Sequence, residues 1–142
     1  MTAGSDAGGL NQRDAVLFAN EAFYLAFADG DFEGMADLWA DSEQVACIHP
    51  GWPPLYGRAE VLASWQGILA NPQQPEVRCR DARAFVRGDE AFVLCYEEIA
   101  GSFLIATNIF TRVGRSWRLV HHQAGPTNGQ PEDGESEPPA LN

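Results

Sequence analysis

Two histidines, His49 and His121, stand where a side chain could act as a general acid or base. Imidazole gains and loses a proton near neutral pH, which makes histidine the commonest group for proton transfer in enzymes. His49 ends a short apolar run and is followed by Pro50-Gly51, which interrupts regular structure, so we expect it at a pocket mouth. Both are therefore catalytic candidates. The alternative for His49 is a structural histidine bonded to nearby backbone.

The position of His121 follows from the alternation of the last apolar run, residues 116–124. Successive side chains of a strand point to opposite faces, so Trp117, His121 and Gln123 are expected on one face. That face is apolar at one end and polar at the other, which suits the lining of a cavity. The opposite face would carry His122, directed toward a dimer interface or solvent.

Asn108 lies among apolar neighbours in the preceding run, where a buried amide must find a hydrogen-bond partner. We expect it to orient a ligand carbonyl or to bond to a neighbouring side chain. Strand alternation over residues 90–100 turns either Glu97 or Glu98 inward, and we favour Glu97 as the residue that contacts a ligand. The remaining predicted ligand-binding residues are aromatic: Trp52, Tyr56 and Trp65.

No metal site or cofactor is predicted. His49 and His121 lack acidic or histidine partners at ligand spacing. The three cysteines are widely spaced without a C-x-x-C pair, which is typical of buried free thiols in a reducing compartment. We therefore expect a cytoplasmic protein. The formal net charge of −11 and only nine basic residues argue against nucleic acid or an anionic membrane as partner.

The pattern along the chain predicts three helices and then a run of hairpin-linked strands. Residues 1–10 are expected to form a flexible tail, residues 11–126 one domain, and residues 127–142 an acidic, proline-rich mobile tail. The predicted helices begin at Asn11, Phe32 and Gly57, a short strand covers residues 44–49, and later strands cover 77–87, 90–100, 103–113 and 116–124. Helices followed by consecutive strands indicate an α+β fold with a curved antiparallel sheet.

Three segments carry a resemblance to a known family. Residues 47–58 (CIHPGWPPLYGR), 106–110 (ATNIF) and 117–122 (WRLVHH) resemble SnoaL-like domains of the nuclear transport factor 2-like superfamily. The similarity extends over about residues 13–126. It implies a cone of three helices packed on a curved sheet around a pocket, and a homodimer formed through the outer sheet face.

The functional implication of the resemblance is broad, because the superfamily includes isomerases, cyclases, epoxide hydrolases, dehydratases, transport adaptors and assembly domains. Related sequences often end in three histidines and Ala-Ser-Pro, where this chain has Gln123 and Gly125. We expect the pocket to bind a small, mostly apolar, oxygenated molecule, with acid–base catalysis as one reading. The alternative is a non-catalytic ligand sensor or a homo-oligomeric assembly module.

Overall fold

The structure is a computed structural model that describes residues 3–133, with side chains from residue 12 onward. It contains three helices, α1 (Ala3–Asp29), α2 (Phe32–Leu38) and α3 (Arg58–Ala70). Its strands are β1 (Ala46–Ile48), β2 (Leu55–Tyr56), β3 (Arg78–Arg87), β4 (Glu90–Ile99), β5 (Ser102–Val113) and β6 (Ser116–Pro126). The predicted α+β order is confirmed. The two-residue strand β2 was not predicted.

The helices begin and end for local reasons. Gly30 has a positive φ of +64° and ends α1, a conformation that glycine adopts without steric cost. Asp31 then caps α2, and its carboxylate accepts a hydrogen bond of 3.0 Å from the backbone N–H of Gly34. The first helix differs from the prediction because it begins at Ala3 instead of Asn11. The flexibility of residues 1–10 stays a prediction.

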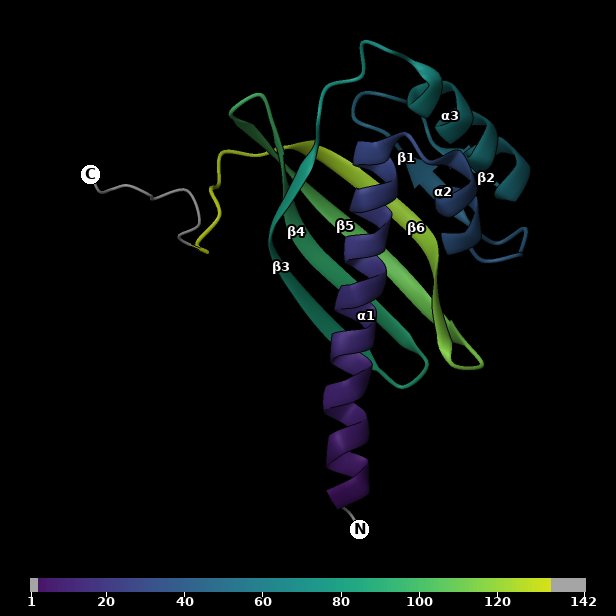
Figure 1. Ribbon diagram of the computed structural model, residues 1–142, viewed down its shortest axis with the longest axis vertical. Helices are drawn as coiled ribbons and strands as arrows, with labels where there is room; N and C mark the ends of the chain where they lie inside the picture. The colour runs from purple at the N-terminus through teal and green to yellow at the C-terminus, as the bar shows by residue number, and fades with distance from the viewer. Residues whose placement is uncertain (1–2, 134–142) are drawn as a thin grey trace.

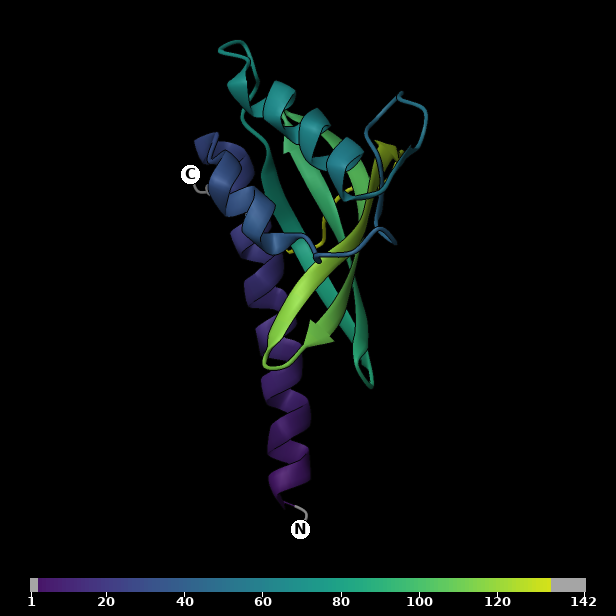
Figure 2. The same ribbon diagram turned by 90° about the vertical axis from the view of Figure 1, so that its right-hand side faces the viewer.

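The six strands form one sheet in the order β2-β1-β6-β5-β4-β3. All neighbours are antiparallel except β1 and β6, which run parallel, so the sheet is mixed and not wholly antiparallel as predicted. In Figures 1 and 2, α1 lies along one face of β3 to β6, and α3 lies beside the upper end of the same sheet. The other face carries no helix in the described part of the chain.

The core lies between the helices and that covered face. Phe23 from α1, Trp65 from α3 and Phe110 from β5 are all completely buried, and the rings of Phe23 and Trp65 meet edge to face at 5.4 Å. Large aromatic side chains contribute much of the hydrophobic stabilisation of such a core. Trp65, predicted as a ligand-binding residue, is thus a central part of this core.

A β-bulge in β6 changes which side chains face the core. Ile109 of β5 pairs with His121, whereas the next residue, Phe110, pairs with Leu119, so Val120 is an extra residue in β6. The segment that follows α2 is hydrogen-bonded to β6 next to this bulge: the Ala40 N–H donates to the Leu119 carbonyl at 2.9 Å. After an extra residue, each following side chain of the strand points to the opposite face of the sheet from the one that regular alternation predicts. The residues of β6 after the bulge therefore face opposite to the prediction.

The C-terminal segment after β6 was predicted to be mobile, but residues 127–133 contact the sheet. Asp133 accepts two hydrogen bonds from the Arg80 guanidinium, at 2.8 and 3.1 Å, and Arg80 is only 3% exposed. The backbone N–H of Glu132 donates to Asp81 at 2.9 Å. The arginines of β3 attract this acidic segment, which the composition alone did not reveal. Residues 134–142 lie outside the described residues.

Within the described residues, no helix is long and apolar enough to cross a membrane.

Candidate acid–base site

The site is centred on the Asn108 side chain, which β5 directs into the core. Its amide nitrogen donates to Asn20 Oδ1 at 2.8 Å and to Tyr24 Oη at 3.2 Å, and both acceptors come from α1. Its Oδ1 lies 2.6 Å from Nδ1 of His122 in β6. Both the nitrogen and the oxygen of this amide therefore have hydrogen-bond partners, as a buried amide requires. Asn108 fixes the positions of three other polar side chains.

The partners of Asn108 determine the tautomer of His122. An amide oxygen can only accept, so His122 Nδ1 must carry the proton and donate to it. Burial, together with the nearby His49 and His121, lowers the pKa of His122 to about 3. The imidazole is therefore neutral at physiological pH, and its Nε2 holds a lone pair. This is the state that a general base requires.

Glu97 faces the lone pair of His122. Its Oε2 lies 3.8 Å from His122 Nε2 and accepts a hydrogen bond of 2.7 Å from Tyr24 Oη. Burial raises the pKa of Glu97, and the hydrogen bond from Tyr24 offsets part of that effect. No ion pair among the described residues joins Glu97 to an arginine. Both pKa shifts oppose the doubly charged state of the pair, and at 3.8 Å the two atoms are too far apart for a direct hydrogen bond.

Tyr24 completes the network from the helix side. Its hydroxyl donates to Glu97 and accepts from Asn108 and, at 3.4 Å, from the Cys95 thiol. Burial raises its pKa well above 10, and the nearby Cys95 and Glu97 raise it further. Tyr24 therefore stays protonated and holds the Glu97 carboxyl group in one orientation.

A second imidazole, that of His49, stands beside the network at the end of β1. Its ring centroid lies 6.4 Å from that of His122 and 4.8 Å from that of Trp65. Ser64 Oγ donates to the Val61 carbonyl at 2.7 Å, so it accepts the 2.9 Å bond from His49 Nε2–H. Burial lowers the pKa of His49 to about 4. The ring is thus also neutral, and its Nδ1 carries the lone pair.

Two buried groups near His49 bear on ligand recognition. The indole N–H of Trp65 is buried without a hydrogen bond of ordinary geometry to any described residue. Burial raises the pKa of the Cys47 thiol to about 12, and the neighbouring Trp65 opposes this only in part. The thiol is consequently inert as a nucleophile. An unbonded donor inside a core is costly unless a ligand or water satisfies it.

The structure brings together some of the predicted site residues. His49, Asn108, Glu97 and Trp65 are buried side chains on the covered face of the sheet or beside it, and Glu97, not Glu98, is the one that faces inward. Trp52 is 44% exposed, but its ring packs against His49 at 4.8 Å, so it lies at the outer edge of the site.

Four residues lie on a different side of the sheet, or are more exposed, than the sequence predicted. Beyond the bulge, Gln123 is exposed on the outer face, and His121 uses its Nδ1 to bond the Ala46 carbonyl at 3.0 Å. His122, predicted to face outward, is 1% exposed and lies in the network instead. Tyr56 is 68% exposed because the short strand β2 occupies the sheet edge. A single inserted residue accounts for the exchange of His121 and His122.

Sequence reasoning missed the two residues that α1 contributes. Asn20 and Tyr24 are four residues apart, which places them on one face of a helix, and both are buried. The pattern that identifies them is a pair of polar groups at helical spacing on the same face as Val16 and Phe23. A helix face that packs on a sheet carries such groups only where they find partners across the core.

The chain belongs to the SnoaL-like domain family, whose sequence model matches residues 16–127. It has the nuclear transport factor 2-like fold, as similar solved structures show. A curated relative, the F-box protein SKIP8 of Arabidopsis thaliana, is 30% identical over 112 residues, which are 78% of this chain. The matched region is 48% of that relative, so the chain spans about half its length.

Two solved structures are similar in sequence as well as in fold. One is a putative dehydratase of the NTF2-like family from Streptomyces avermitilis, 38% identical, with a TM-score of 0.75, covering 84% of this chain and 98% of that one. The other is a putative calcium/calmodulin-dependent protein kinase type II association domain from Thiobacillus denitrificans. It is 31% identical, with a TM-score of 0.71, covering 77% and 92%.

Proposed function

We propose that the protein eliminates water from a small, mostly apolar compound that carries a hydroxyl group β to a carbonyl. The observation that carries the proposal is the buried pair of His122 Nε2 and Glu97 Oε2, which lie 3.8 Å apart in surroundings that shift the pKa of each toward its neutral form. The similarity to a putative dehydratase supports the same class of reaction. The aromatic surroundings from Phe23, Trp65 and Trp52 favour an apolar substrate.

The reaction assigns opposite roles to the pair. His122 Nε2 removes the hydrogen next to the carbonyl, and protonated Glu97 donates its proton to the departing hydroxyl, which leaves as water. The electron pair of the broken C–H bond forms the new carbon–carbon double bond as the C–O bond breaks. His122 is then a cation and Glu97 an anion, and return of the proton across the gap restores both. The Trp65 N–H supplies a donor for the substrate oxygen.

A direct test uses aromatic β-hydroxy ketones and β-hydroxy acids as substrates. Elimination is followed by the ultraviolet absorbance of the conjugated product and by the exchange of the α-hydrogen in deuterium oxide. We expect Glu97→Gln to lower kcat at least a hundredfold, because glutamine cannot supply the proton. His122→Gln should abolish both elimination and α-hydrogen exchange.

The chain offers matched controls one residue away from each member of the pair. Glu98→Gln and His121→Gln make the same chemical changes on the opposite face of the same strands, so both should retain activity. If His121→Gln lost as much activity as His122→Gln, the assignment to the inner face would be refuted. If no compound of this class reacted or exchanged its α-hydrogen, the proposed reaction would be wrong.

A second candidate function, homo-oligomeric assembly, is favoured by the outer sheet face. Phe85 and Leu94 are 44% and 39% exposed there, and no helix covers this face among the described residues. Exposed apolar surface of this kind is characteristic of protein interfaces. The similar association domain supports a homodimer through this face.

Leu94→Glu should shift the protein from dimer to monomer in light scattering. A wild-type monomer would exclude this candidate.

A further inference from the structure

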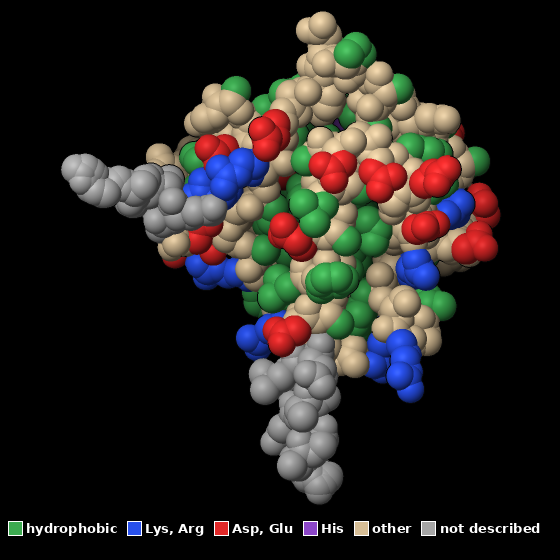
Figure 3. Space-filling view, in the orientation of Figure 1, with side chains coloured by type: hydrophobic (Ala, Val, Ile, Leu, Met, Phe, Trp, Pro, Cys, Tyr) green, Lys and Arg blue, Asp and Glu red, His purple; other side chains and the backbone are tan. Residues whose placement is uncertain are grey.

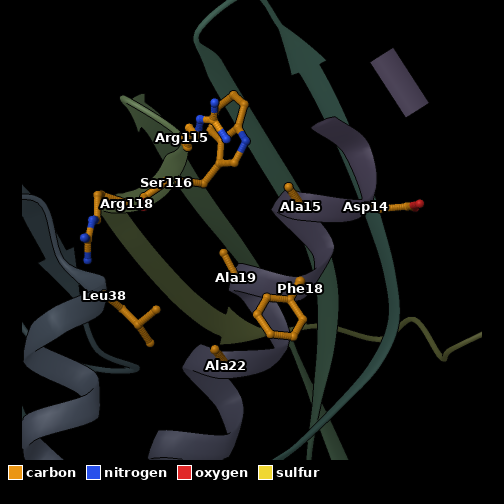
Figure 4. Close-up of a pocket in the computed structure, with 10 residues that line it drawn as sticks. Asp14, Ala15, Phe18, Ala19, Ala22, Leu38, Arg115, Ser116 and Arg118 are labelled. Carbon is orange, nitrogen blue, oxygen red and sulfur yellow. The ribbon is translucent and has the colours of Figure 1, made fainter. Parts of the chain in front are cut away.

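A second hollow lies away from the acid–base site, between α1, the end of α2 and the β5–β6 hairpin. It is a groove of about 600 Å³ (Figure 4). Its β6 lining, Ser116 to Arg118, precedes the bulge at Val120, whereas His122 of the acid–base site follows it. Volumes of this size are typical of small-molecule sites. The groove and the acid–base site are therefore separate.

The long side of the groove is apolar. Ala15, Ala19 and Ala22 line it from one face of α1, and Leu38 of α2 faces them, as Figure 4 shows. The small alanine side chains leave the trough open. Phe18 forms the rim of the groove and is 76% exposed, although water disfavours the exposure of a large apolar side chain. In Figure 3, hydrophobic side chains gather along the middle of α1, and basic side chains lie below and to the right.

The hairpin end of the groove is positively charged. Arg115 and Arg118 line it together with Ser116, and neither arginine forms an ion pair with any described residue. The one carboxylate in the lining, Asp14, points away from the groove in Figure 4. Two unpaired guanidinium groups are notable in a chain with twenty acidic and nine basic residues. They provide a site for an anion.

Two side chains at this end, Trp117 and Arg118, are held in position. The Trp117 indole N–H donates to Gln12 Oε1 at 2.8 Å, and the Arg112 guanidinium lies 5.8 Å from the centre of its ring. Arg118 donates to the backbone carbonyl of Asp37. Groups that are already ordered lose less entropy when a ligand binds, which favours affinity.

We propose that this groove binds a small amphiphilic carboxylate, with its head group on Arg115, Arg118 and Ser116 and its apolar body along the alanines of α1. A guanidinium group pairs with a carboxylate through two parallel hydrogen bonds. A single negative charge fits better than an acidic peptide, because the net charge of −11 repels a highly charged partner more strongly. The proposal does not depend on the acid–base function.

The test is a titration with dodecanoate below its micelle concentration, followed by two-dimensional NMR of the ¹⁵N-labelled full chain. We expect saturable shifts in residues 14–22 and 115–118. Dodecanol and dodecylamine, which have the same chain length, should bind at least about tenfold more weakly, because neither offers an anion to the arginines. Equal binding of all three would indicate non-specific apolar adsorption and would overturn the proposal.

Variants locate the binding and separate it from the catalytic proposal. Arg115→Gln combined with Arg118→Gln should weaken dodecanoate at least about tenfold, whereas Arg87→Gln, a matched change elsewhere, should not. Ala19→Leu, which fills the trough, should also weaken binding. His122→Gln should bind dodecanoate as the wild type does. The proposal is wrong if the double variant binds unchanged, if the shifts fall outside the groove, or if an acidic helical peptide binds more tightly than dodecanoate.

Discussion

Glu97 and Glu98 are neighbours in β4, but the two faces of the sheet give them different chemistry. Glu97 points inward, where its partners are the Tyr24 hydroxyl and the neutral His122. Glu98 points outward and pairs with Arg80 at 2.8 Å. Burial on the inner face thus shifts the pKa of the carboxyl toward its neutral form, whereas the outer-face carboxylate is paired with an arginine. The surroundings of a carboxylate, and not its identity, decide which role it has.

The two polar clusters also differ in what holds them. The inner cluster connects α1 to β4, β5 and β6, and each member is bonded to a side chain distant in sequence. The outer cluster connects β3 and β4 to the C-terminal segment through Asp133. Loss of one member should therefore be costly inside, where no water reaches the unpaired group, and less costly outside.

The largest expected effect is on the inner cluster. Asn108→Ala leaves His122 Nδ1–H and Asn20 Oδ1 buried without partners, and each such group costs about 1–3 kcal/mol. We expect the free energy of unfolding in urea to fall by about 4 kcal/mol. Thr107→Ala, at the adjacent outward-facing position, should change it by no more than about 0.5 kcal/mol. Equal effects of the two substitutions would show that the amide network does not stabilise the fold.

The sequence predicted the general position of this network but not its membership. The α+β order, Asn108 and the inward direction of Glu97 followed from strand alternation and helical spacing. The choice between His121 and His122 did not, because the bulge at Val120 depends on pairing with β5 and with the chain leaving α2. A regular period of two cannot reveal an inserted residue, and a bulge reverses every later assignment.

The second effect is the pH dependence of stability. The pKa values of His49 and His122 fall to about 4 and about 3 in the folded state, below the ordinary value of about 6.5. As pH falls below about 6.5, the unfolded chain takes up protons that the folded chain does not, so stability decreases. The slope is about 1.4 kcal/mol per pH unit for each histidine. For each histidine, this loss of stability continues until the pH reaches the pKa of that histidine in the folded state.

Glu97 acts in the opposite direction, because its raised pKa makes the folded state lose stability as pH rises above the ordinary carboxyl value. The comparison of wild type with His122→Gln isolates the histidine. We expect urea unfolding from pH 7 to 4 to show a shallower loss of stability in His122→Gln, while Thr107→Ala retains the wild-type slope. An unchanged slope in His122→Gln would mean that its imidazole is not protected from protonation.

The third effect concerns the outer cluster. Asp133→Asn removes the charge that two Arg80 hydrogen bonds rely on, and Arg80 is almost completely buried. Glu98 still pairs with Arg80, and the Asp133 side chain is 23% exposed, so the loss should be moderate. We expect thermal unfolding to report a decrease of about 1–2 kcal/mol. No change would show that the C-terminal segment does not dock in solution.

The smallest effect is expected one residue earlier in the same segment. Glu132 contacts Arg83 at 3.4 Å, and their side chains are 79% and 58% exposed. Water and salt screen such a pair, and ordering two long side chains offsets much of the attraction. Glu132→Gln should therefore leave the melting temperature within the scatter of replicates, at low and high salt alike. A loss as large as that of Asp133→Asn would mean that charge, and not burial of Arg80, holds the segment on the sheet.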